Sequence, residues 1–219
     1  MLIAFRSSKP GERRSLAQCR KPSGWLGRCV IWTMNRGHGR LTEWGLARVT
    51  IGAGDVILDV GCGGGRAVSR LAALATRGRV YGVDHSEASV AAARRANRGW
   101  IAEGRVEIQQ GSVSALPYAT ATFDLATAVE SHFWWPDLPA DVKEIWRVLK
   151  PGGRVLLVAE FYNGGRHAKH AERLSAFTGM AAMTVGEHRE LLSRAGFVDV
   201  DVVEEARRGW ICAMGRRPA

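Results

Sequence analysis

The chain is poor in cysteine and has no long apolar stretch. Its 219 residues include four cysteines, and no two of them form a Cys-x-x-Cys pair. This scatter argues against a zinc site and against a disulfide framework, so a reducing cytoplasm is the expected location. No run of 18 apolar residues occurs, so no transmembrane helix is expected. The length predicts one domain with a full hydrophobic core.

Acidic residues are scarce in the first 50 positions. This segment holds ten Lys and Arg residues against Glu12 and Glu43, which gives +8 of the formal net charge of +10. The remaining body is therefore nearly neutral, and the whole-chain charge is a poor argument for nucleic-acid binding. Residues 1–20 carry Ser, Pro, Gly and charge without periodicity, which predicts a disordered basic arm.

A glycine-rich turn follows the first predicted strand. The segment VILDVGCGGGR begins at Val56 as a short apolar run suited to a buried parallel strand. Gly61, Gly63 and Gly65 allow a sharp turn and a close approach of the backbone to a ligand. The dinucleotide fingerprint Gly-x-Gly-x-x-Gly fails, because its third glycine position is Arg66.

An acidic residue also ends the next predicted strand, residues 79–84, one helix further along the chain. A carboxylate at that tip, Asp84, can accept hydrogen bonds from both hydroxyls of a ribose. Ser86 then caps a predicted helix over 87–98. Strand, glycine loop, helix, strand and acid together predict a nucleotide-binding corner.

These segments resemble the motifs of class I S-adenosylmethionine (SAM)-dependent methyltransferases. Asp59-x-Gly-x-Gly-x-Gly resembles the first motif of that family, and the resemblance covers about residues 35–214. It is closest to the small-molecule branch that includes ubiquinone- and menaquinone-biosynthesis-type enzymes. The resemblance implies that SAM is the cofactor, that S-adenosylhomocysteine (SAH) is the product, and that the loop wraps the methionine and ribose parts of SAM.

The same resemblance implies the architecture. We expect an α/β, Rossmann-like, doubly wound sheet of seven strands, with the last strand antiparallel as a reversed edge strand. A helical cap over 21–50 would precede the SAM-binding domain, 51–219, and an insertion over 161–183 would form a lid. The sequence pattern places strands near 55–60, 79–84, 105–110, 123–129, 153–160, 198–204 and 209–214, and helices near 65–76, 87–98, 138–148 and 184–195.

The expected cofactor-binding residues are Asp59, Gly61, Cys62, Gly63, Gly65, Asp84, His85, Ser112, Val113 and Glu130. Cys62 is interpreted as a small packing residue of the loop. Ser112 stands where the family often has an Asp that binds the adenine amine, so backbone atoms of Val113 are expected to share that contact.

Methyl transfer is an in-line displacement on an activated carbon, so positioning supplies much of the rate and a base is needed only for a protonated nucleophile. The site is expected outside the C-terminal ends of the first and fourth strands. There, His132 is the first candidate for a general base, and Glu130 is expected to orient the methionine part of SAM or the acceptor. His38, with Asn35, is expected to approach from the cap.

Two further groups have open interpretations. Phe133, Trp134 and Trp135 could stack on a substrate or on the sulfonium, or pack under the lid. His167 and His170 would share a helix face, but no carboxylate at matching spacing completes a metal site, so no metal is expected.

Three functions remain open from the sequence. The leading one is methyl transfer to the O, N, C or S atom of a small molecule. A nucleic-acid methyltransferase could use the basic arm to hold phosphates, but neither an Asn/Asp-Pro-Pro-aromatic motif nor a Pro-Cys nucleophile is present after the fourth strand. The third is a non-catalytic SAM-binding protein. A homodimer is also left open.

Overall fold

The computed structural model describes residues 38–219. The predictions for the basic arm, for most of the helical cap and for Asn35 lie outside these residues. The described strands are β1 (Val56–Val60), β2 (Arg79–Asp84), β3 (Val106–Gln110), β4 (Phe123–Val129), β5 (Leu149–Ala159), β6 (Val198–Glu205) and β7 (Trp210–Arg216). The helices are α3 (Gly39–Leu46), α4 (Arg66–Leu74), α5 (Glu87–Ala96), α6 (Arg98–Ala102), the short 3-10 helix η1 (His132–Trp134), α7 (Leu138–Val148), α8 (Ala168–Thr178) and α9 (Val185–Arg194).

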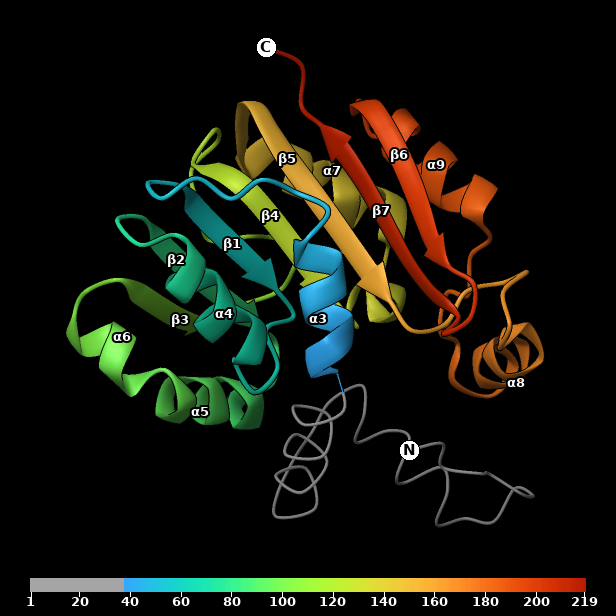
Figure 1. Cartoon of the computed structure of the whole chain (residues 1–219), viewed down its shortest axis with the longest axis horizontal. Helices are drawn as coiled ribbons and strands as arrows, with labels where there is room; N and C mark the ends of the chain where they lie inside the picture. Colours follow the sequence, from blue (N-terminus) through green and yellow to red (C-terminus); the bar gives the residue numbers. More distant parts are fainter. Residues whose placement is uncertain (1–37) are drawn as a thin grey trace.

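The seven strands form one sheet in the order β3-β2-β1-β4-β5-β7-β6 (Figure 1). The first five strands are parallel, and β7 runs antiparallel to both β5 and β6. The predicted α/β architecture with a reversed last strand is confirmed. The predicted edge position of that strand is wrong, because β7 lies between β5 and β6.

The composition of the last two strands explains their order. Residues 210–213 of β7 are all buried, as an apolar interior strand requires. In β6, Asp199 and Asp201 are exposed and no residue is fully buried. Charged side chains on an outermost strand discourage pairing with further chains, so β6 suits the edge.

Alternating side chains of the strands build two cores, one on each face of the sheet. On β1, Ile57 belongs to one core and Leu58 to the other, and Leu156 and Leu157 of β5 divide in the same way. This alternation follows from the two-residue repeat of a strand. Both faces are apolar because helices cover both, which is the usual arrangement around parallel strands.

The helices are divided between the two faces. α3, α4 and α5 pack on the first core through Leu41, Leu71 and Ala93, whereas α7 and α9 pack on the second through Ile145 and Leu192. Figure 1 shows α3 and α4 in front of the sheet and α7 behind it. None of the helices in residues 38–219 has the length and apolar character needed to cross a bilayer.

The helix boundaries follow the signals in the sequence. Ser86 accepts a hydrogen bond from the Ser89 N–H at the start of α5, and Thr184 and Glu187 form a reciprocal capping box at the start of α9. The predicted helix over 87–98 corresponds to α5, which ends two residues earlier, and the separate helix α6 begins at Arg98. α5 ends at Ala96, because the buried side chain of Asn97 donates to the carbonyl groups of Gly65 and Ala93.

The 161–183 segment contains one helix, α8 (Ala168–Thr178). Its flanks contribute Tyr162 and Met180 to a third, smaller apolar cluster with Phe133. The Ala181 N–H also donates to the Phe133 carbonyl oxygen at 2.9 Å. The insertion is therefore fastened to the chain that follows β4, at the end of the sheet where the cavity described below opens.

Candidate active site

A cavity of about 280 Å³ lies at the C-terminal ends of β1, β2 and β4. β1 pairs with β2 on one side and β4 on the other, so the cavity lies where the chain order along the sheet reverses, the usual ligand site of such sheets. Its walls are formed by His38, Thr42, Asp59–Gly64, Arg66, Ala67, Val83–His85, Ser89, Gly111–Val113, Val129–Ser131 and Trp134–Pro136. Most of the predicted site residues thus meet in one place.

The glycine loop divides its residues between the cavity and the core. Gly61, Gly63 and Gly65 all have positive φ values, of 73°, 51° and 80°, which favour glycine. Gly61 and Gly63 line the cavity, whereas Gly65 does not. A Cβ on Gly65 would lie 2.5 Å from Asn97 Nδ2 and 2.8 Å from Ala93 Cα. The third glycine therefore serves the close packing of α4 on α5.

Asp84 is held in place by two backbone groups. Its Oδ2 accepts the Gly63 N–H and its Oδ1 accepts the Ser86 N–H, both at 2.9 Å. The side chain is only 8% exposed, yet it lines the cavity. Each carboxylate oxygen retains lone-pair capacity for another donor. This geometry fits the predicted role of accepting ribose hydroxyl groups.

Asp59, at the end of β1, lies deeper in the same wall. It is 2% exposed, and its Oδ1 accepts a hydrogen bond from the Thr127 hydroxyl at 2.7 Å. Burial raises the pKa of Asp59 to about 7, the nearby charge of Asp84 adds to the rise, and the Thr127 hydrogen bond opposes it. Burial therefore favours the protonated form of this carboxyl group more than water does.

The far end of the cavity contains the residues expected near the adenosine. His85, Ser112 and Val113 all line it. The Ser112 hydroxyl accepts the Ser114 N–H at 3.2 Å, so it is already engaged in its own turn. Cys62 is 6% exposed, and burial raises its thiol pKa well above the usual value. A protonated, enclosed thiol fits the interpretation of Cys62 as a packing residue.

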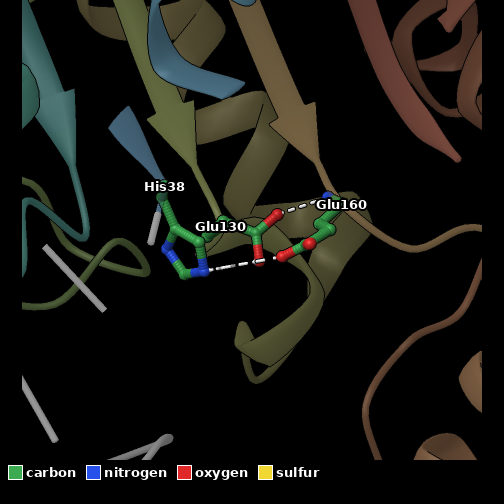
Figure 2. A group of neighbouring side chains, drawn as sticks. All are labelled: His38, Glu130 and Glu160. Atoms are coloured by element: carbon green, nitrogen blue, oxygen red, sulfur yellow. Dashed lines mark hydrogen bonds and ion pairs between the residues drawn. The ribbon is translucent and has the colours of Figure 1, made fainter. Parts of the chain in front are cut away.

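The opposite end is polar and is formed by three elements. Figure 2 shows His38, which precedes α3, with Glu130 after β4 and Glu160 after β5. His38 Nε2 lies 3.9 Å from Glu130 Oε2 and 3.7 Å from Glu160 Oε2. Glu130 Oε1 accepts the Glu160 N–H in a short hydrogen bond. His38 and Glu130 line the cavity, so this cluster borders it directly.

Burial shifts both inner groups of this cluster toward their neutral forms. It lowers the pKa of His38, an effect that the negative charge of Glu160 partly offsets. It raises the pKa of Glu130 to about 8, and the Glu160 charge contributes to that rise while the Glu160 N–H opposes it. Near pH 7, His38 is neutral and can accept a proton.

The family assignment follows from a comparison of the sequence. Residues 58–157, which run from β1 to β5 and include the glycine loop, match the family model described as a methyltransferase domain. Residues 58–157 therefore form a methyltransferase domain, and the fold around them is that of the class I methyltransferases. SAM is the cofactor of that family, and the cofactor predicted from the glycine loop is the same.

Several relatives and solved structures are similar to this methyltransferase chain. The O-methyltransferase resE of Aspergillus sclerotiorum is 34% identical over 170 residues, which are 75% of this chain and 63% of the relative. A demethylmenaquinone methyltransferase of Lactobacillus johnsonii is 34% identical over 109 residues, 49% of this chain and 45% of the relative. The Haloferax volcanii methyltransferase in complex with its activator Trm112 superposes with a TM-score of 0.73 at 21% identity, covering 97% of this chain and all of that one.

The matches do not extend over the whole of the curated relatives. The chain spans 42%, 63% and 46% of the lengths of three of them. The shared part is the methyltransferase domain, so the comparisons support the fold and the family, and the acceptor has to be inferred from the site.

The structure does not bring His132 of the methyltransferase to the cavity. Its ring is 1% exposed and lies in η1, with Nε2 3.4 Å from His188 Nε2. Burial and the neighbouring His188 lower its pKa well below the usual value. His132 follows Glu130 by only two residues, so the sequence predicted that both would reach the cavity. The chain bends between them, because Glu130 has a φ of 58° and Ser131 starts the 3-10 turn, and His132 is directed into the core.

The aromatic residues after β4 have different environments. Trp134 and Trp135 line the cavity, which fits contact with a ligand. Phe133 is 6% exposed and packs with Tyr162 and Met180, so it lies under the insertion. No described side chain of 161–183 lines the cavity itself.

Sequence reasoning missed three residues near the cofactor site. Thr42 of α3 and Arg66, the first residue of α4, both line the cavity. Glu160 joins the polar cluster from the end of β5. Its position as the last residue of the predicted strand over 153–160 was a usable signal. Of the predicted histidine pair, His167 lies before α8, and the side chain of His170 is outside the described part.

Proposed function

We propose that this chain transfers the methyl group of SAM to a small-molecule acceptor. The observation that carries the proposal is one cavity that joins the glycine loop and Asp84 at one end to a polar, partly open cluster at the other. An adenosine seated against Asp84 would extend its methionine part along Gly61 and Asp59. Its sulfonium would then face the end of the cavity at which an acceptor can arrive.

The acceptor is inferred to bind between the polar cluster and the two tryptophans. Trp134 and Trp135 offer flat apolar surfaces to the cavity, and His38 and Glu130 offer it polar atoms. Aromatic faces suit a planar or apolar body and also favour the positive sulfonium. A hydroxyl-bearing, largely apolar molecule fits this combination.

His38 is the better placed of the two predicted histidine bases. It is neutral at pH 7 and lines the cavity, whereas His132 lies in the core against His188. Removal of a proton from the acceptor would let its electron pair attack the methyl carbon while the carbon–sulfur bond breaks toward sulfur. Glu130, next to His38, would orient the acceptor or the cofactor. The role of His132 in turnover stays a prediction.

The decisive test separates cofactor binding from turnover. Calorimetric titration of the purified chain with SAM and SAH should show one site. Asp84→Ala should weaken SAH binding about 100-fold, because loss of hydrogen bonds to a charged group costs roughly 1.5–3 kcal/mol each. Asp201→Ala, on the exposed edge strand β6, is the matched control and should leave the affinity unchanged.

Turnover is measured as SAH released in the presence of a panel of small phenols, enols and carboxylic acids. Acceptor-dependent SAH formation supports the proposal, and a lack of SAM binding by a folded sample would refute it. SAM binding without any product would support the non-catalytic alternative. Location in the cytoplasm is also proposed, consistent with the free thiols of Cys62 and Cys212; a homodimer stays a prediction.

A further inference from the structure

Three side chains of metal-binding type converge at the polar end of the cavity. His38, Glu130 and Glu160 come from three separate segments of the chain, and their ligand atoms all lie within 4.8 Å of one another (Figure 2). The two measured nitrogen-to-oxygen distances, 3.7 and 3.9 Å, are longer than a hydrogen bond. The facing nitrogen and oxygen atoms of the three side chains therefore lie around a common point and are not hydrogen-bonded to one another.

The charges of this cluster are not balanced by the described residues. Within residues 38–219, neither Glu130 nor Glu160 forms an ion pair with a lysine or arginine. Two carboxyl groups and one imidazole without a lysine or arginine partner form a ligand set of the metal-binding type.

One carboxylate oxygen is already oriented toward that point. The Glu130 side chain is only 9% exposed, and its Oε1 is fixed by the Glu160 N–H. Its Oε2 faces His38 and accepts no hydrogen bond from a described residue. This oxygen is therefore available as a ligand for a cation placed beside the His38 ring. The left-handed backbone of Glu130, with φ of 58°, maintains this orientation.

We propose that His38, Glu130 and Glu160 bind a divalent transition-metal ion, such as Mn²⁺ or Zn²⁺, at the acceptor end of the cavity. Metal binding requires deprotonated ligands, so Glu130 would release its proton to solvent as the ion binds. One imidazole and two carboxylates then balance a charge of +2 and suit these ions better than Ca²⁺ or Mg²⁺, which prefer oxygen ligands. Metal–ligand bonds of about 2.0–2.2 Å place neighbouring ligand atoms roughly 3.0–3.4 Å apart. The two distances from His38, 3.9 and 3.7 Å, exceed this spacing by about half an ångström. All ligand atoms lie within 4.8 Å of one another, and the half-exposed Glu160 side chain can rotate to bring them closer.

The ion would have open coordination positions toward the cavity, because His38 and Glu130 line it. This consequence rests on the proposed methyl transfer. It narrows the acceptor to molecules that offer a metal a hydroxyl, enol or carboxylic oxygen. With the ion bound, His38 Nε2 would serve as a ligand and the ion would replace it in activating the acceptor, because a metal-bound hydroxyl loses its proton to water more readily. The resulting oxygen anion would form the bond to the methyl carbon, and the carbon–sulfur electron pair would stay on sulfur as SAH.

The test is calorimetric titration of the metal-free, full-length protein with MnCl₂ and, separately, with ZnCl₂. We expect one site per chain, with binding retained when the protein is saturated with SAH. Glu160→Gln should weaken Mn²⁺ binding about tenfold or more, because it removes one charged ligand. Its SAH affinity and circular dichroism spectrum should match the wild type.

Glu43→Gln is the matched control, because Glu43 is an exposed acid on α3, the helix that begins directly after His38. It should leave Mn²⁺ affinity unchanged. The proposal is overturned if protein that binds SAH normally binds neither ion at about 1 mM, or if Glu160→Gln binds Mn²⁺ as the wild type does. Loss of Mn²⁺ on addition of SAH would also overturn it, because the cofactor's own ammonium group would then occupy the cluster. Because SAH binding is measured separately, failure of the metal site is distinguished from failure of the proposed function.

Discussion

Alanine substitutions at two glycines of the loop should separate folding from cofactor binding. In Gly65→Ala, the left-handed φ of 80° costs about 1–2 kcal/mol. The new methyl group also overlaps Asn97 and Ala93, at 2.5 and 2.8 Å, and such overpacking costs about 1–3 kcal/mol. The free energy of unfolding should therefore fall by roughly 2–5 kcal/mol. For a chain of this size the melting temperature should fall by roughly 4–20 °C.

Gly63→Ala is the matched variant, two residues earlier in the same loop. Its φ is 51°, and no heavy atom lies within 4 Å of the added Cβ. Only the backbone cost of about 1–2 kcal/mol applies, so the melting temperature should fall by roughly 2–8 °C. The methyl group points into open space in a cavity wall, however, so SAH affinity should fall about tenfold or more.

The two variants are compared by thermal denaturation followed by circular dichroism, and by SAH calorimetry well below either melting temperature. Gly65→Ala should be the less stable of the two and should bind SAH nearly as the wild type does. The reasoning is refuted if the two variants melt at the same temperature. It is equally refuted if Gly65→Ala loses SAH binding while Gly63→Ala retains it.

Three further predictions concern the acidic and imidazole groups. His38→Ala should lower turnover at least about tenfold while SAH affinity changes less than about threefold; equal turnover would remove His38 from the mechanism. His132→Ala, for a side chain outside the cavity, is expected to act mainly on stability; a loss of turnover in fully folded protein would restore the catalytic role predicted from the sequence. Burial keeps His132 and His188 neutral when folded, so their stabilisation is present above about pH 6.5 and is lost as pH falls toward 5. The loss of stability is at most about 2 kcal/mol per histidine. It is measured as the difference between the free energies of urea unfolding of the wild type and of His132→Phe at each pH, because the subtraction removes the opposing contributions of Asp59 and Glu130. If this difference is the same at pH 7 and pH 5, the assignment is contradicted.

Much of the fold could be predicted because its signals are local. Apolar runs ending in Asp59 and Asp84 marked two strands, and the Thr184–Glu187 spacing marked a helix start. The order of β6 and β7 could not be predicted in the same way. The sequence is compatible with β7 pairing with β5, with β6 or with both. Which of β6 and β7 lies at the edge depends on which strand buries its side chains on both faces of the sheet.

The cofactor end of the site was predictable and the acceptor end was less so. Residues directly at the ends of parallel strands share one edge of the sheet, so the sequence pattern was sufficient to place Gly61, Gly63 and Asp84 at the cavity. After β4 the direction of each side chain depends on single dihedral angles. The left-handed Glu130 directs its own side chain to the cavity and carries His132 into the core.

The position of β7 has a consequence for how the molecule is made. The strand nearest the carboxyl terminus fills a gap between two strands that precede it in the chain, with backbone hydrogen bonds on both sides. Until residues 210–216 have left the ribosome, β5 and β6 each have one edge whose backbone N–H and C=O groups lack a partner strand. Nascent or prematurely terminated chains would thus expose strand edges that can pair with other chains. Deletion of the chain from Trp210 onward should therefore yield aggregates instead of a smaller folded protein.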